Sequence, residues 1–123
     1  MFRLDSSALN RISRLNIKIT LLYLHVVDLA KAHVQAVDLC LQGISDGFKA
    51  INLGSGSGYS VLEVISSFEK ASGIKLNWEF APRREGDVTR LYCDPIVAEK
   101  EIGWKTTKTL DEMCADIRII LKI

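Results

Sequence analysis

The chain has 123 residues, of which 48% are hydrophobic and 25% are charged, and its formal net charge is +1. This composition is ordinary for one globular domain, and the near-neutral charge gives no electrostatic footprint for nucleic acid. Three separated cysteines without a Cys-x-x-Cys pair argue against a disulfide framework or a zinc site, and they favour a cytoplasmic location. No apolar run reaches about 18 residues, so no membrane partner is expected.

Residues 1–20 differ in composition from the rest of the chain. Arg3, Arg11, Arg14 and Lys18 are opposed by one acid, Asp5, and several serines lie among them. A transit peptide is one interpretation of such a segment, but a convincing amphipathic stripe is missing, which favours a poorly ordered leader. We therefore predict a leader over residues 1–20 and one domain over residues 21–123.

Strand patterns and helix patterns alternate from residue 17 onward. Apolar residues on both faces predict a buried strand over residues 17–26. Asp28 is predicted to cap a helix that runs to about Leu41, and Gly43 follows as its stop signal. A short strand is predicted over residues 50–53.

The glycine-rich run over residues 54–58 resembles a dinucleotide-binding turn only superficially. The fingerprint Gly-x-Gly-x-x-Gly requires a third glycine, and neither Tyr59 nor Val61 supplies it. A structural turn is therefore favoured. It leads into a capping box, Ser60-x-x-Glu63, at the start of a helix that ends at Gly73, and a half-buried strand follows over residues 74–80.

Two further helices complete the pattern. Asp94-Pro95 predicts a helix that ends at Gly103, and Thr109-x-x-Glu112 predicts a last helix. The last helix is expected to turn five side chains inward: Leu110, Met113, Cys114, Ile117 and Leu121. The alternation predicts an α/β fold with few strands and flanking helices.

The loop over residues 82–87 brings chemically useful groups together. Arg84 offers a planar fork for phosphate oxygens, and Asp87 can accept hydrogen bonds from a ribose diol. Gly86 allows the backbone between them to turn tightly. By spacing alone, solvated or mutually paired side chains are the commoner interpretation of such a loop.

Other residues with functional chemistry have structural interpretations. His25 and His33 lack a carboxylate or cysteine partner at ligand spacing. Cys40 lies on an apolar helix face and is expected to behave as a small core residue. Trp78 and Trp104 are expected to pack in the interior rather than to stack on a base.

Five stretches, taken together and in this order, closely resemble the UDP-glucose 4-epimerase family: residues 23–30, 52–63, 68–73, 82–88 and 98–104. The resemblance extends over roughly residues 23–118. It implies the C-terminal, substrate-binding portion of an extended short-chain dehydrogenase/reductase, without the N-terminal Rossmann domain. The usual dimer contact of the family lies in that other portion, so a native dimer is not expected.

The resemblance also implies functions for particular residues. In the family, tightly held NAD takes a hydride from C4 of the sugar and returns it to the opposite face, which interconverts UDP-glucose and UDP-galactose. Carried onto this chain, Arg84 matches the arginine on the UDP phosphates and Asp87 the acid on the ribose hydroxyls. Leu91 falls near the position whose bulk limits the hexose pocket. The expected partner is thus UDP-glucose or UDP-galactose.

The chain also departs from the family pattern. Leu21 replaces a second phosphate-binding arginine, a loss of about 1.5–3 kcal/mol of binding. No Tyr-x-x-x-Lys pair for proton exchange is present, because the residues four beyond the three tyrosines are Val27, Glu63 and Ile96. Side chains cannot replace a hydride acceptor. We therefore expect no cofactor and no catalytic residue within this chain, and no epimerisation by the chain alone.

Several functional hypotheses follow from these matches and departures. The chain is a fragment of a UDP-hexose 4-epimerase or of another nucleotide-sugar dehydratase or epimerase, or it is a non-catalytic module that binds UDP-sugars. It could also be an interaction protein that docks on a full-length subunit, because faces that normally meet the absent half would be exposed.

Overall fold

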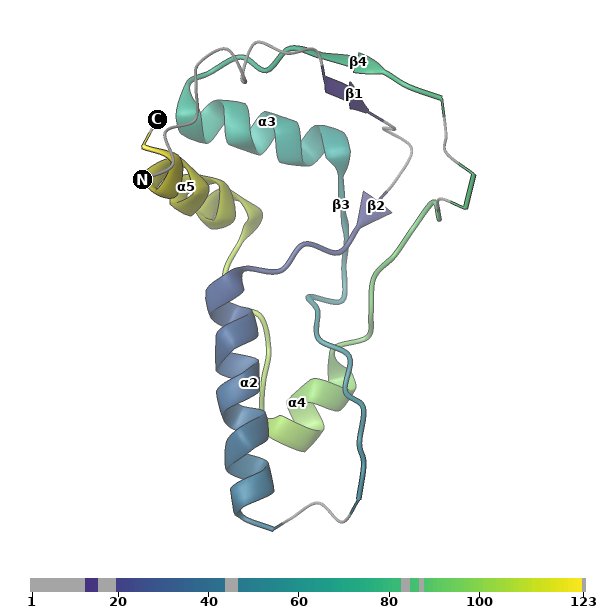
Figure 1. Cartoon of the computed structure of the whole chain (residues 1–123), viewed down its shortest axis with the longest axis vertical. Helices are drawn as coiled ribbons and strands as arrows, with labels where there is room; N and C mark the ends of the chain where they lie inside the picture. The colour runs from purple at the N-terminus through teal and green to yellow at the C-terminus, as the bar shows by residue number, and fades with distance from the viewer. Residues whose placement is uncertain (1–12, 16–19, 44–46, 83–84, 87, 123) are drawn as a thin grey trace. The chain divides into compact units, whose positions relative to one another are not determined.

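The computed structural model describes residues 13–15, 20–43, 47–82, 85–86 and 88–122 (Figure 1). The chain divides into two compact units, and each is considered by itself. The first unit contains Met1–Leu21, Tyr59–Arg90 and Thr109–Ile123, and the second contains Leu22–Gly58 and Leu91–Lys108.

Two helices form the centre of the first unit. Helix α3 (Val61–Ser72) packs against α5 (Leu110–Leu121). Ile65 of α3 and Cys114 of α5 are buried, and the Ser67 hydroxyl donates a 2.6 Å hydrogen bond to Asp111 Oδ1. Because the packed apolar stripe and this polar contact join the same two helices, they fix the pair together.

Both helices of this pair begin at the predicted capping boxes. In α3 the Ser60 hydroxyl accepts from the Glu63 backbone N–H, and Glu63 accepts from the Ser60 N–H. In α5 Thr109 and Glu112 make the same reciprocal bonds. Each box satisfies two backbone donors that a helix start leaves without partners, so the local sequence determines where these helices begin.

Two short pairs of strands complete the described part of this unit. Strand β1 (Ser13–Leu15) runs parallel to β4 (Trp78–Phe80), with Arg14 opposite Glu79. Strand β2 (Thr20–Leu21) pairs antiparallel with β3 (Tyr59–Ser60). The pairings thus join β1 and β2 to the strands that follow and precede α3 in the sequence.

The second unit is built on α2 (Val26–Leu41) and the shorter α4 (Ile96–Ile102). Ala32 of α2, Ala98 of α4 and Trp104 form its buried core. Four partly buried hydrophobic residues pack around that core: Leu24, Ile51, Leu53 and Ile102. Small residues at the helix contact leave room for the one large aromatic side chain, which fills the space beside them.

The predicted fold class is confirmed, and several local predictions need correction. Residues 50–53 form no strand, because within the described residues no neighbouring strand lies beside them to complete a ladder. Of the strand predicted over residues 17–26, residues 16–19 lie outside the described residues and only Thr20–Leu21 is observed as a strand. Hydrophobic patterning alone does not supply a hydrogen-bonding partner.

Three side chains also differ from expectation. Helix α2 is capped by His25, whose Nδ1 accepts from the Val27 N–H at 3.1 Å, and not by Asp28. Cys40 is exposed, and Ile117, which was predicted to face inward, is 43% exposed. Cys40 lies in the last turn of α2, and Ile117 lies in the C-terminal half of α5.

Candidate functional site

The loop that carries the predicted phosphate and ribose contacts follows β4. Arg84 and Asp87 lie outside the described residues, so their contacts stay predictions. Within the described part, the loop is fastened at both ends. Before it, β4 pairs with β1, and after it the Thr20 N–H donates to the Thr89 carbonyl at 2.9 Å. Strand β1 and Thr20 therefore anchor the loop on either side.

The described residues inside this loop fit a tight, exposed turn. Gly86 has φ of +85°, a left-handed conformation that a residue with a Cβ adopts with strain. Glu85 and Gly86 are exposed. The tight turn predicted at Gly86 is thus confirmed for the backbone, and the roles of Arg84 and Asp87 stay predictions.

Leu91, the residue predicted to limit the sugar pocket, begins the stretch 91–108 of the second unit. Leu91 is 56% exposed, so a ligand can reach its side chain. The structure tests no role in sugar selection, and that role stays a prediction.

The glycine-rich turn packs against the chain's own side chains. A Cβ on Gly54 would lie 2.5 Å from Cys93 Sγ and 2.9 Å from Leu22 Cδ1. Gly56, with φ of +75°, lies against Pro95, so that a Cβ there would approach the proline ring at 3.1 Å. In a dinucleotide-binding turn, the glycine backbone leaves space for a pyrophosphate. Here Cys93 and Pro95 lie in contact with that backbone. The glycine-rich segment is therefore a turn packed against side chains of its own unit.

Asp28 forms a buried hydrogen-bond network that sequence patterns did not indicate. Its Oδ2 accepts from the backbone N–H groups of Thr107 at 2.8 Å and Lys108 at 2.9 Å, and its Oδ1 accepts from the Thr107 hydroxyl at 2.7 Å. Its backbone carbonyl accepts from Trp104 Nε1 at 2.8 Å. One residue of α2 thus holds the segment 104–108 through backbone and side chain.

The protonation of Asp28 is set by opposing effects. Burial, the largest single effect, raises its pKa, but hydrogen bonds from the Thr107 hydroxyl and from the backbone of Lys108 and Thr107 outweigh it. Lys31, 3.9 Å away, adds a favourable charge. The pKa of Asp28 therefore lies below its ordinary value of 3.8, and the residue is ionised at neutral pH.

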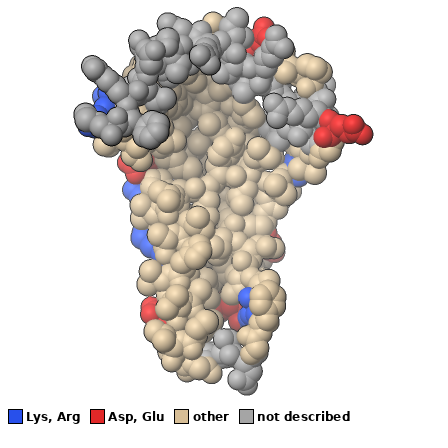
Figure 2. Space-filling model, viewed as in Figure 1, with Lys and Arg blue, Asp and Glu red and all other residues tan. Residues whose placement is uncertain are grey.

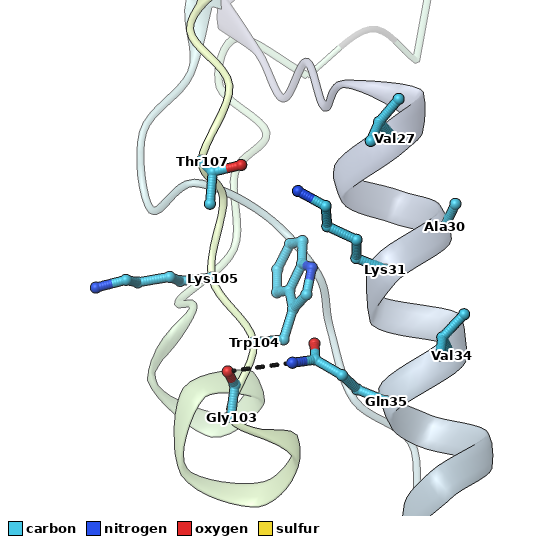
Figure 3. Close-up of a pocket in the computed structure, with 9 residues that line it drawn as sticks. All are labelled: Val27, Ala30, Lys31, Val34, Gln35, Gly103, Trp104, Lys105 and Thr107. Carbon is cyan, nitrogen blue, oxygen red and sulfur yellow. Dashed lines mark hydrogen bonds between the residues drawn. The ribbon is translucent and has the colours of Figure 1, made fainter.

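A hollow of about 550 Å³ lies between α2 and the segment 103–107 (Figure 3). Lys31 and Gln35 extend from the helix toward that segment, and Gln35 Nε2 donates to the Gly103 carbonyl at 3.5 Å. The helix side of the hollow includes three aliphatic residues: Val27, Ala30 and Val34. Leu91 is not among the residues that line this hollow.

The remaining candidate residues have structural roles. His25 is buried and caps α2, and His33 Nδ1 lies 2.8 Å from the Leu29 carbonyl one turn earlier. Trp104 is buried in the core, and Trp78 packs edge-to-face on Phe80 with ring centroids 5.2 Å apart. Among the residues with described placement, no three His, Cys, Asp or Glu side chains form a group that could hold a metal ion. No helix in that part of the chain is long and apolar enough to cross a membrane.

Comparison with curated proteins gives a consistent set of relatives. The chain is 49% identical over 94 residues to UDP-glucose 4-epimerase of Drosophila melanogaster and 50% identical over 94 residues to that of Bacillus subtilis. Each match covers 76% of this chain and 27% of the relative, so the chain spans about a quarter of the length of these proteins. No protein-family model matches the chain.

Solved structures agree with the sequence comparison. The crystal structure of UDP-glucose 4-epimerase from Bifidobacterium longum in complex with NAD⁺ and UDP matches with a TM-score of 0.68 at 49% identity. This match covers 76% of the chain and 27% of the solved chain. The fold is therefore that of part of an extended short-chain dehydrogenase/reductase, as predicted.

Proposed function

We propose that this chain, which resembles UDP-glucose 4-epimerases over 94 residues, carries part of a UDP-hexose site and does not epimerise sugars by itself. The main support for the proposal is the 49–50% sequence identity to these enzymes over 76% of the chain. Identity at that level over 94 residues does not arise by chance. The substrate class is then a uridine diphosphate sugar.

In this proposal the loop after β4, residues 82–87, binds the nucleotide. Arg84 binds the diphosphate through its guanidinium fork, and Asp87 accepts from the ribose hydroxyls. The anchored ends of the loop and the left-handed Gly86 support the proposal, because they restrict the positions that the two side chains can adopt. Leu91 contributes an accessible aliphatic side chain that would border the hexose.

We expect the purified chain to form no UDP-galactose from UDP-glucose, even with added NAD. The physical reason is that the chain has no Tyr-x-x-x-Lys pair for proton exchange, and its glycine-rich turn is filled by Cys93 and Pro95. The measurement is product detection by proton NMR after prolonged incubation. The Bacillus subtilis enzyme serves as the positive control, and turnover by the chain at any rate above the enzyme-free background would contradict the expectation.

Substitution of Arg84 is expected to weaken UDP binding by about 10- to 100-fold, because a charge-assisted contact with phosphate contributes about 1.5–3 kcal/mol. Isothermal titration calorimetry of Arg84→Ala with UDP measures the change. Raising the salt concentration should weaken binding to the unmodified chain more than binding to the variant.

Arg83→Ala is the matched control, since it removes the same charge from the adjacent position and should leave the affinity within about threefold of the unmodified chain. Asp87→Ala should abolish discrimination between UDP and 2′-deoxy-UDP. Equal effects of Arg83→Ala and Arg84→Ala would indicate a general charge effect and would remove Arg84 from the proposed site.

A second candidate function, docking on a full-length epimerase subunit, is favoured by the many large hydrophobic residues left exposed, among them Phe48 at 95% and Leu41 at 81%. Co-purification of a tagged chain with a full-length epimerase would support it. A cytoplasmic location stays a prediction.

A further inference from the structure

Arg90 follows the loop after β4, and its backbone position is fixed by pairing. An isolated parallel bridge joins Arg90 to Thr20, and the Thr20 N–H donates to the Thr89 carbonyl at 2.9 Å. Thr20 also pairs with Ser60, because β2 and β3 run antiparallel to each other. Three segments of the first unit therefore lie side by side in the order Ser60, Thr20 and Arg90.

This pairing places a hydroxyl and a guanidinium next to each other. Residues that pair directly across neighbouring strands carry their side chains on the same face, with Cβ atoms about 5 Å apart. The side chains of Thr20 and Arg90 are therefore neighbours on one face. The Ser60 hydroxyl lies on that face as well, but it is engaged with Glu63 at the start of α3.

Arg90 has no protein partner in the part of the chain that the structure describes. It is exposed and forms no hydrogen bond or ion pair with another described residue. Arg118, the other arginine whose side chain is described, instead donates to the Ala71 carbonyl at 3.5 Å. The nearby carboxylate of Glu63 already accepts from the backbone N–H and the hydroxyl of Ser60. The Arg90 guanidinium is therefore available to an external anion.

We propose that Arg90, assisted by the Thr20 hydroxyl, is a further contact for the diphosphate of a uridine diphosphate sugar. The inference rests on the proposed function, which assigns the nucleotide to the loop over residues 82–87. A planar guanidinium binds two phosphate oxygens at once, and a neighbouring hydroxyl can donate to a third. Arg90 is thus a binding residue and not a catalytic one, because a guanidinium does not give up its proton in a protein.

Chain length keeps Arg90 close to the proposed nucleotide site. Arg90 follows Asp87 by three residues, so their Cα atoms lie no more than about 11 Å apart in any conformation. A ribose bound at Asp87 carries its diphosphate on the 5′ carbon, within reach of a side chain as long as arginine. On the face drawn in Figure 2, the charged side chains of the described residues are scattered and form no large patch of one sign. Attraction for a diphosphate is therefore expected to depend on a few individually placed cations.

Isothermal titration calorimetry with UDP compares the unmodified chain with three variants. Arg90→Ala should bind UDP about 5- to 20-fold more weakly, because a charge-assisted contact is lost at an exposed position. Arg90→Lys keeps the charge without the planar fork and should recover part of this loss. Thr20→Val keeps the shape of the side chain and the backbone bridge, and it should weaken binding about two- to fivefold. Circular dichroism checks that each variant keeps its helices.

Two controls separate a phosphate contact from a structural role of Arg90. Uridine has no phosphate, so its binding to Arg90→Ala, followed by saturation-transfer NMR, should stay within about twofold of its binding to the unmodified chain. Lys70→Ala is the matched control, since it removes one exposed positive charge of the same unit that pairs with Asp111 at 3.7 Å. This control should leave the affinity for UDP within about twofold.

The outcomes distinguish this inference from the proposed function. UDP binding that Arg84→Ala weakens and Arg90→Ala leaves unchanged would overturn the inference alone. Equal effects of Arg90→Ala and Lys70→Ala on UDP binding would also overturn it, as would an equal loss of UDP and uridine binding in Arg90→Ala. A folded, unmodified chain that binds no UDP would overturn the proposed function and this inference with it.

Discussion

Asp28→Ala should lower the free energy of unfolding by about 2–4 kcal/mol. The substitution removes the acceptor for the backbone N–H groups of Thr107 and Lys108 and for the Thr107 hydroxyl. Because Asp28 is fully buried, water does not replace the lost acceptor without further rearrangement. Urea unfolding followed by the fluorescence of Trp104, in a Trp78→Phe background, measures the change beside the affected network.

Two comparisons separate this network from a general loss of charge. Asp28→Asn keeps an acceptor oxygen and should cost clearly less than Asp28→Ala. Glu99→Ala removes an exposed acid of the same unit and should change stability by no more than about 0.5 kcal/mol. If Asp28→Ala were as mild as Glu99→Ala, the network would not hold the segment 104–108.

The stabilising effect of Asp28 should also depend on pH. Its pKa in the folded chain lies below 3.8, so its contribution is complete above that value and is lost as the pH falls through the folded pKa. The difference in unfolding free energy between the unmodified chain and Asp28→Asn should therefore shrink below about pH 4. Other carboxylates with lowered pKa values, including Glu69 and Asp111, act equally in both proteins and cancel in the difference.

Gly54→Ala is expected to destabilise the second unit by about 1–3 kcal/mol, because the added methyl group overpacks a closed contact. Its Cβ would lie 2.5 Å from Cys93 Sγ and within 3.1 Å of both methyl groups of Leu22. The effect is steric, since Gly54 does not have a left-handed backbone. Thermal unfolding by circular dichroism gives the change in stability.

The double variant Gly54→Ala, Cys93→Ala identifies the contact. Removal of Sγ takes away the atom nearest to the added methyl group, so the double variant should recover a substantial part of the loss. Strictly additive effects of the two substitutions would show that Cys93 is not what closes the turn.

Local signals predicted the helices well. The capping boxes at Ser60 and Thr109 and the glycine stops at Gly73 and Gly103 act over a few residues, and all four mark helix ends in the structure. These signals work because they satisfy backbone groups of the same segment. The resemblance of five ordered stretches identified the relatives that the comparisons found.

Contacts between distant residues were not predictable from patterns. The bond from Thr107 to Asp28 joins residues 79 positions apart, and nothing in the spacing of either segment indicates it. A strand at residues 50–53 likewise depends on a neighbour that the hydrophobic pattern does not specify.

The central claim is the proposal that this chain binds UDP through Arg84 and Asp87. Calorimetric titration of the unmodified chain with UDP tests this proposal most directly. Parallel titrations with uridine and with inorganic pyrophosphate separate the two halves of the ligand. We predict saturable heat with one UDP bound per chain and much weaker binding of either half. An absence of heat from a chain whose helices are intact by circular dichroism would contradict the claim.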